Sequence, residues 1–174
     1  MGLDITYYSK LTEAKDNEAF DATGELKDDE WIQIYVNDDF PGRADRLKHK
    51  HAYKFESSDG FVAGSYSGYN SWREELAKLI GYTPVAIDRF GTGKIQIRYD
   101  AGAAAVESGP FWELINFSDC EGVIGPATSA KLAKDFMAYQ EKADQHEDEW
   151  FRFQYAKWRK AFEVAADNGA VEFH

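Results

Sequence analysis

Alternation of apolar and polar side chains in the first third of the chain predicts several β-strands. Residues 3–8 and 31–36 are rich in aromatic and β-branched residues, which favour half-buried strands. The segment 61–70 begins in the same way and ends in glycine, serine and asparagine, so it predicts a strand that runs into a turn. Residues 10–30 are polar and acidic, which indicates a surface loop. Shorter signals predict a strand at 52–55 and a turn at 57–60.

The middle of the chain predicts a β-hairpin. Residues 84–87 and 95–99 flank a glycine-containing turn at 90–94, a pattern typical of two antiparallel strands. A phosphate-binding loop would need a helix after these glycines, whereas a strand signal follows. The remaining predictions for this region are a linker at 101–108, a buried strand at 111–117 and a loop at 118–126.

Apolar residues recur at helical spacing in three segments. The first is expected to begin at Ser71, because Ser71 and Glu74 form an S-x-x-E capping box, and to end at Gly81. The other two helices are predicted at 126–145 and at 148–167, the last one capped by Gly169.

The order of these elements predicts the fold class. The strands cluster early and do not alternate regularly with helices, which indicates an α+β fold. We expect a mostly antiparallel sheet with about three helices, of which the last two are long and pack as an antiparallel pair. The 174 residues, 44% of them hydrophobic, suffice for one domain over 1–174.

The charge balance and the single cysteine narrow the classes of partner and compartment. A net charge of -11 disfavours general affinity for nucleic acid or an anionic membrane. No apolar run is long enough to span a bilayer, and the start lacks the pattern of a signal peptide. Cys120 alone cannot form an internal disulfide. We therefore expect a cytoplasmic protein. The myristoylation pattern M-G-x-x-x-[ST] is formally matched at 1–6, but these residues are better interpreted as the start of a strand.

Three segments together carry a resemblance to known sequences. They are MGLDIT at 1–6, AGSYSGYNSWR at 63–73 and ELINFSDCEGVIGP at 113–126. The combination resembles a family of small uncharacterised proteins encoded by tailed phages and prophages. The resemblance covers residues 1 to about 140 and implies a setting, the cytoplasm of an infected bacterium. It implies no catalytic residues, because that family has no assigned activity.

The glycine-rich segment at 64–70 is the first candidate binding site. Glycines allow a ligand to approach the backbone, and a following helix N-terminus favours an anion. The side chains that would bind a phosphate or carboxylate are Ser65, Ser67, Tyr69, Asn70 and Arg73. The alternative is that helix capping and tight packing alone explain this composition.

The polar segment at 116–122 is the second candidate. A loop at the end of a rigid element often carries binding residues. Cys120 could act as a nucleophile, but its acidic neighbours would raise the pKa of the thiol. The stronger interpretation is that Asp119 and Glu121 bind a ligand hydroxyl or a metal, and Asn116 and Ser118 are further ligand-binding candidates. The alternative is a loop whose side chains satisfy their own backbone.

A basic island at 43–54 and the aromatic last helix complete the candidates. The island could draw an anionic ligand into a local pocket, or it could simply pair with the acidic loops. His49 and His51 have a spacing that can suit a metal, but two histidines do not make a metal site, and no metal or cofactor is expected. The last helix has more aromatic residues than one buried stripe needs, which indicates either a homodimer through it or simple burial in the core.

Together these features favour a phage-encoded protein that binds a small anionic, nucleotide-like ligand and sequesters a host defence signal. The chain shows no complete catalytic set, so we expect a binding protein before an enzyme. The alternative is an acidic inhibitor of a host nucleic-acid-binding defence protein, acting through the acidic tracts at 13–39 and 141–149. A hydrolase that uses Asp119, Glu121 and a histidine is the third hypothesis.

Overall fold

The computed structural model describes residues 2–15, 18–88 and 91–174. Met1, the first residue of the myristoylation pattern, and Phe90, the first of the predicted turn, therefore lie outside the described residues. The strands are β1 (Gly2–Ser9), β2 (Thr12–Glu13), β3 (Trp31–Gln33), β4 (Ala52–Lys54), β5 (Ser57–Ser65), β6 (Val85–Ile87), β7 (Gln96–Arg98), β8 (Gly122–Ile124) and β9 (Ala170–Phe173). The helices are α1 (Tyr66–Ile80), α2 (Tyr99–Ala104), α3 (Trp112–Ile115), α4 (Pro126–Ala138), α5 (Gln140–Asp144) and α6 (Glu149–Ala165).

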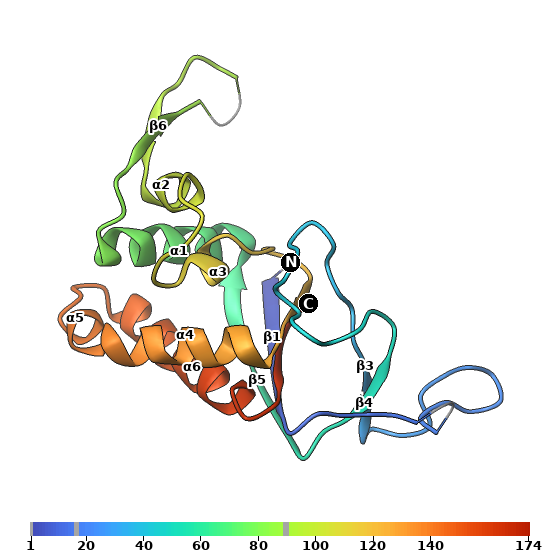
Figure 1. Cartoon of the computed structure of the whole chain (residues 1–174). Helices are drawn as coiled ribbons and strands as arrows, with labels where there is room; N and C mark the ends of the chain where they lie inside the picture. Colours follow the sequence, from blue (N-terminus) through green and yellow to red (C-terminus); the bar gives the residue numbers. More distant parts are fainter. Residues whose placement is uncertain (1, 16–17, 89–90) are drawn as a thin grey trace.

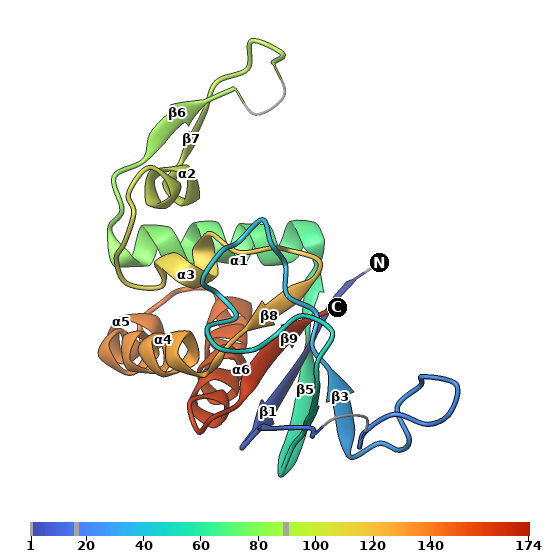
Figure 2. The same cartoon turned by 45° about the vertical axis from the view of Figure 1, so that its right-hand side comes forward.

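The main sheet has four strands in the order β5-β1-β9-β8, and every neighbouring pair is antiparallel. Its second inner strand is β9, which follows the last helix and lies between β1 and β8 (Figure 2). The sequence analysis predicts no strand there, because four residues are too few for a clear alternation. Gly169 makes the approach of β9 possible. A Cβ at this position would overlap the backbone of Tyr8, and the Gly169 amide also donates to the Ala165 carbonyl, 2.8 Å away.

The main sheet is covered on both faces. Helices α1, α4 and α6 lie on one side of it, and the smaller sheet β2-β4-β3 lies on the other (Figure 1). Neighbouring residues of one strand point to opposite sides. Tyr7 belongs to the helical cluster and Tyr8 to the cluster beneath the small sheet, and Ile124 and Val123 divide in the same way. This alternation is what a strand buried on both faces requires.

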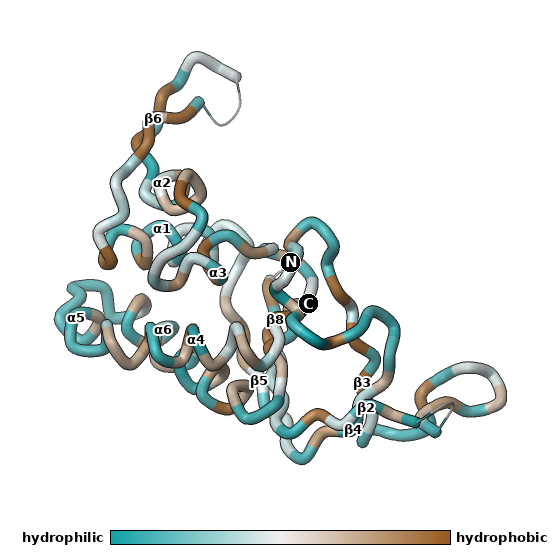
Figure 3. Tube along the Cα trace, in the orientation of Figure 1, coloured by the Kyte–Doolittle hydropathy of each residue, from teal (hydrophilic) through white to brown (hydrophobic). Residues whose placement is uncertain are grey.

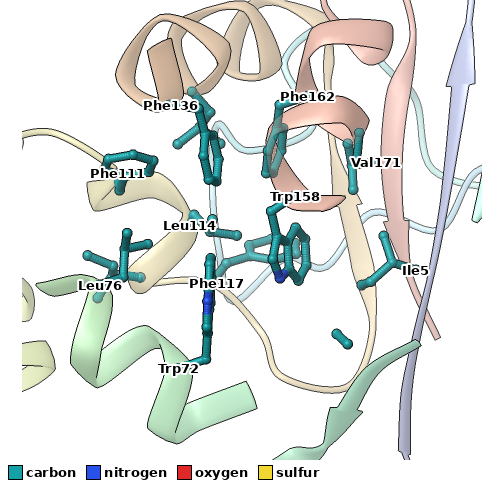
Figure 4. Packing of buried hydrophobic residues seen from close by; sticks show 14 of the residues in the cluster. Ile5, Trp72, Leu76, Phe111, Leu114, Phe117, Phe136, Trp158, Phe162 and Val171 are labelled. Carbon is teal, nitrogen blue, oxygen red and sulfur yellow. The ribbon is translucent and has the colours of Figure 1, made fainter. Parts of the chain in front are cut away.

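The helical side holds most of the aromatic core. The indole of Trp158 stacks on Trp72 with ring centroids 5.8 Å apart, and on Phe162 at 5.9 Å. Figure 4 shows Trp158 among these rings and Ile5 of β1. Helices α4 and α6 pack together, and Tyr155 donates a hydrogen bond of 2.8 Å to the carbonyl of Phe136.

The α+β class is confirmed, with antiparallel sheets and six helices among the described residues. Only α1, α4 and α6 exceed ten residues, so about three substantial helices is the correct number. The predicted helix at 126–145 is two helices, because the chain breaks at Tyr139. The hairpin at 84–99 is also confirmed, as β6 and β7 pair antiparallel.

Several predicted boundaries are wrong. Helix α1 begins at Tyr66, with Ser65 as its N-cap, so Ser71 lies inside the helix and forms no capping box. Residues 57–60, predicted as a turn, belong to β5 and pair with β1. Strand β3 ends at Gln33, short of the predicted 36.

The region between the hairpin and α4 also differs from the prediction. The linker at 101–108 contains most of helix α2, whose first amides, those of Tyr99 and Asp100, donate to the Glu74 carboxylate at 2.8–3.0 Å. The buried strand predicted at 111–117 is the short helix α3, which follows Phe111 in the left-handed region at φ 58°. The loop at 118–126 contains the buried strand β8.

Candidate functional site

The two polar segments singled out in the sequence meet in space. The Nδ2 atom of Asn70 on α1 donates to the Oδ2 atom of Asp119, at 2.6 Å. The Nη1 atom of Arg73 donates to the carbonyls of Phe117 and Ile115, at 2.5 and 3.1 Å. Residues 42 to 49 positions apart in sequence therefore form one polar cluster, as the binding hypothesis requires.

This polar cluster is closed in on itself and does not form an open cradle. Arg73 is only 9% exposed, and its other Nη atom donates to the amide oxygen of Asn70. Its guanidinium carbon lies 4.6 Å from the ring centroid of Tyr69, which is fully buried. Burial raises the pKa of Tyr69 far above its usual range, an effect that Arg73 opposes and Asp119 increases. The donors of Asn70 and Arg73 thus bind the protein itself, whereas the buried hydroxyl of Tyr69 has no hydrogen-bond partner among the described residues.

A tryptophan side chain packs against the glycines of the first candidate segment. The ring of Trp150 on α6 lies 3.4 Å from the place where a Cβ of Gly64 would be, and 3.9 Å from that of Gly68. The hydroxyl of Ser65 caps α1 by accepting from the amide of Gly68 at 3.1 Å, and lies 3.1 Å from the hydroxyl of Ser67. The capping and packing alternative therefore describes Ser65, Gly64 and Gly68 correctly.

The second candidate segment satisfies its own backbone in the same way. The Ser118 hydroxyl accepts hydrogen bonds from the amides of Cys120 and Glu121, at 3.2 and 3.1 Å. Cys120 and Glu121 are exposed. Asn116 lines a hollow of about 210 Å³ beside Arg98, and its Nδ2 atom is buried without a hydrogen-bond partner among the described residues.

The basic island pairs with the acidic loops. Lys48 and His51 both contact the carboxylate of Glu13, at 2.8 and 2.7 Å, and Lys54 pairs with Glu30. These contacts lower the pKa of Glu13, with the hydrogen bond from Lys48 as the largest cause and that from His51 next. The interpretation that the island pairs with the acidic loops is confirmed for Lys48 and Lys54.

The two histidines of the island have separate partners. The Nδ1 atom of His49 accepts from the Val36 amide at 3.1 Å, whereas that of His51 faces Glu13. Neither residue lies in a strand, so the H-x-H spacing does not place them on one strand face. In residues 2–15, 18–88 and 91–174, no group of three or more histidine, cysteine or acidic residues could hold a metal ion.

Arg43 hydrogen-bonds to the same segment as Arg73, and this role of Arg43 is not predicted from the sequence. It is buried, donates to the carbonyls of Glu113 and Asn116 at 3.0 and 3.4 Å, and stacks 4.3 Å above the ring of Trp112. Burial lowers the pKa of Arg43. The two arginines thus hold four carbonyls between residues 113 and 117, so neither is a free cation.

The hollows of the surface differ in the charge of their linings. A hollow of about 670 Å³ beside β2 has three lysines and three glutamates, and one of about 630 Å³ beside α5 has more acidic than basic residues. A third, of about 370 Å³, lies between β5 and α6 and has two lysines against one aspartate. We call it the β5–α6 hollow; its lining residues are Tyr7, Asp59, Gly60, Phe61, Phe153, Ala156, Lys157 and Lys160.

The β5–α6 hollow combines cations with aromatic rings. The Nζ atom of Lys157 lies 4.3 Å from the ring centroid of Phe153 and 5.6 Å from that of Phe61. Phe153 is 56% exposed. The carboxylate of Asp59 already accepts from the Gly60 amide at 2.8 Å and from the Tyr7 hydroxyl at 2.9 Å.

The same bonds keep the carboxyl of Asp59 ionised. The Gly60 amide, the Tyr7 hydroxyl and the charge of Lys160 all lower its pKa. Phe153, Lys157 and Lys160 recur at i, i+4 and i+7, so their shared helix face could have been found from the sequence alone.

Comparison of the chain with protein-family models, with curated proteins and with solved structures found no match. The resemblance to phage and prophage proteins therefore stays a prediction. Among the residues that the structure describes, no helix has the length and apolar character needed to cross a bilayer.

Proposed function

We propose that the protein binds a small anionic ligand with a planar ring, and that the β5–α6 hollow is the site. The observation that carries the proposal is the pair Lys157 and Lys160 beside the exposed ring of Phe153. Ammonium groups attract a phosphate or carboxylate, and an exposed aromatic ring offers a stacking surface. A hollow of about 370 Å³ also falls within the size range of small-molecule sites.

The proposal keeps the ligand class expected from the sequence and moves the site. The serines and Arg73 of the predicted cradle are engaged in capping and in carbonyl contacts, so they offer no comparable set of donors. In the setting that the phage resemblance implies, the ligand would be a nucleotide-derived signal that the protein sequesters in a bacterial cytoplasm.

The proposal is tested by titration calorimetry of the purified chain against a panel of mono- and dinucleotides, with chromatography of the recovered ligand. We expect binding of at least one nucleotide, recovered unchanged, and a loss of affinity of about tenfold or more in Lys157→Ala with Lys160→Ala. Lys134→Ala, an exposed lysine of α4, is the matched control and should bind normally. An absence of heat across the panel would refute the proposal.

The other two hypotheses have less support. Glu13 and Glu30, which lie in the acidic tract at 13–39 proposed to mimic nucleic acid, are ion-paired with lysines of the same chain. Asp119, the carboxylate proposed for hydrolysis, is bound to the amide of Asn70. Turnover of a nucleotide in the panel, abolished in Asp119→Ala, would favour the enzyme instead.

A further inference from the structure

The β6–β7 hairpin projects from the body of the molecule as an arm (Figures 1 and 2). One of its faces is apolar and open to solvent: Ile95 is 64% exposed and Ile97 is 61% exposed. Ile97 is paired with Ala86 across the hairpin. Figure 3 shows hydrophobic stretches on both strands of this hairpin.

The opposite side of the arm is tied to the body. Arg98 of β7 bonds to Asp100 at 2.6 Å and lies 3.4 Å from the carboxylate of Glu74 on α1. Ile87 lines the small hollow near α2. The arm is therefore anchored at its base, and Ile95 and Ile97 face away from their own body.

The exposed surface of the chain is larger than a compact shape requires. Its accessible surface is 9441 Å², whereas a compact monomer of 19.8 kDa has about 8,600 Å². The excess of about 800 Å² equals the area that one partner contributes to a standard protein interface. A two-stranded hairpin is also marginally stable on its own, and an exposed apolar face usually marks a contact.

A second apolar surface lies along the first turns of α6 and the neighbouring edge strand β5. It consists of Val62, Trp150 and Phe153, which are 57%, 39% and 56% exposed. The three residues are continuous, because Trp150 packs at Gly64 and Gln154 donates to the Val62 carbonyl at 3.4 Å. We call it the α6 surface.

The arm and the N-terminal end of the α6 surface carry opposite charges. Lys94 precedes Ile95 on the arm, whereas Arg98 is held by carboxylates of its own body. The α6 surface is bordered at its N-terminal end by Glu147, Asp148 and Glu149, and at its other end Lys157 lies beside Phe153. Together the two surfaces hold six of the nine large apolar side chains that are exposed among the described residues.

We propose that the arm of one copy docks on the α6 surface of a second copy. Each contact joins two different surfaces, and a reciprocal exchange of arms repeats it across a two-fold axis, which closes the pair as an isologous dimer. Ile95 and Ile97 lie against Trp150 and Val62 of the other copy, and Lys94 lies near its acidic border. The contact does not depend on the proposed ligand, although Phe153 belongs to both surfaces.

The first test is sedimentation velocity on the full chain from low to high micromolar concentration. We expect a monomer–dimer equilibrium that salt weakens. Ile95→Ser together with Ile97→Ser should weaken it about tenfold or more. Met137→Ser removes an apolar side chain that is exposed outside both surfaces and should leave it unchanged. A strict monomer, or a dimer insensitive to the arm variant, overturns the proposal.

A mixing experiment distinguishes this contact from one that joins two arms or two α6 surfaces. The arm variant keeps an intact α6 surface, and Val62→Lys keeps an intact arm. Each alone should be monomeric, and a mixture of the two should associate through the one arm and the one surface that remain. Circular dichroism checks that both are folded. If one variant alone still dimerises, the contact joins like surfaces, and if the mixture stays monomeric, the arm does not bind the α6 surface; either result overturns the proposal.

Discussion

At the scale of single residues, buried arginines supply hydrogen bonds to backbone carbonyls in and after helix α3. Helix α3 is one turn long, so its carbonyls have few partners within the helix. Arg43 and Arg73 supply donors to four of the carbonyls in and after it. An unpaired buried carbonyl is costly, which explains why two cations are buried here.

Removal of one of these arginines should therefore be costly. We expect Arg73→Met to lower the free energy of unfolding by roughly 2–4 kcal/mol, because two or three buried acceptors lose their donor. Arg46→Met is the control: Arg46 is exposed and bonds to Asn168, so we expect a loss of about 0.5 kcal/mol or less. Urea unfolding of both variants measures the difference. Equal losses would show that the carbonyl contacts contribute little.

Glu172 on β9 should make stability depend on pH. Burial raises the pKa of this carboxyl from 4.5, although the charge of His174 and the hydroxyl of Tyr8 oppose the effect. Because its pKa is raised, the protonated form of Glu172 is favoured in the folded state. This carboxyl therefore stabilises the fold below pH 4.5, and that stabilisation is lost as the pH rises through the folded pKa.

We therefore expect Glu172→Gln to stabilise the protein at pH 7. An increase in Tm of about 2–4 °C corresponds to ~1 kcal/mol in a chain of this length. The difference should vanish below pH 4.5, where the native carboxyl is protonated. Thermal melts at both pH values measure it, and a variant that is less stable at pH 7 would show that the ionised form is favoured in the fold.

Sequence reasoning at this scale found the right residues and the wrong role. Asn70, Arg73 and Asp119 do come together, but their donors and acceptors bind one another and nearby carbonyls. The side chains of serine, asparagine and arginine use the same atoms to hydrogen-bond a backbone group or a ligand. Which of the two they bind depends on long-range packing, which residue types and spacing do not encode.

At the scale of elements, the strands and helices with long apolar alternation are predictable and their ends are not. The two serines at 65 and 71 are both plausible N-caps, and local sequence favours Ser71 through its capping box. The N-cap is instead Ser65, six residues earlier, because Trp150 packs against Gly64 and Gly68 and Tyr69 is buried in the core. Strand β9 was missed for a similar reason, since its pairing partners lie far away in sequence.

Alanine substitutions at the two serines test where α1 begins. We expect Ser65→Ala to cost about 1 kcal/mol, because the amide of Gly68 loses its cap. Ser71→Ala should be neutral or slightly stabilising, because the Ser71 hydroxyl donates to the carbonyl of Ser67 within the helix and alanine has the higher helix propensity. Guanidinium unfolding of both variants measures this, and the reverse order would place the cap at Ser71.

At the scale of the whole molecule, the main sheet joins the two apolar clusters. Tyr8, Val123 and Ala170 belong to the cluster under the small sheet, and their chain neighbours belong to the helical cluster. Neither cluster can lose its strands without exposing the other. This sharing supports the prediction of a single domain, which composition alone does not test.

We therefore expect one cooperative unfolding transition. The tryptophans report mainly on the helical side, where Trp72 and Trp158 are buried, and far-UV circular dichroism reports on the whole backbone. The two signals should give coincident curves in urea. Transitions separated in midpoint would show that the small sheet with its loops unfolds independently.

The position of β9 between β1 and β8 also has a consequence for how the chain reaches its native state. Pairing of Tyr8 with Ala170 closes a segment of about 160 residues, at an entropic cost of about 4.5 kcal/mol in the flexible-loop approximation. Helices α1, α4 and α6 need no such closure. The helical side is therefore expected to assemble first, with insertion of the last strand after the main folding barrier. Substitutions in β9, such as Val171→Ala, should then accelerate unfolding and leave the refolding rate nearly unchanged.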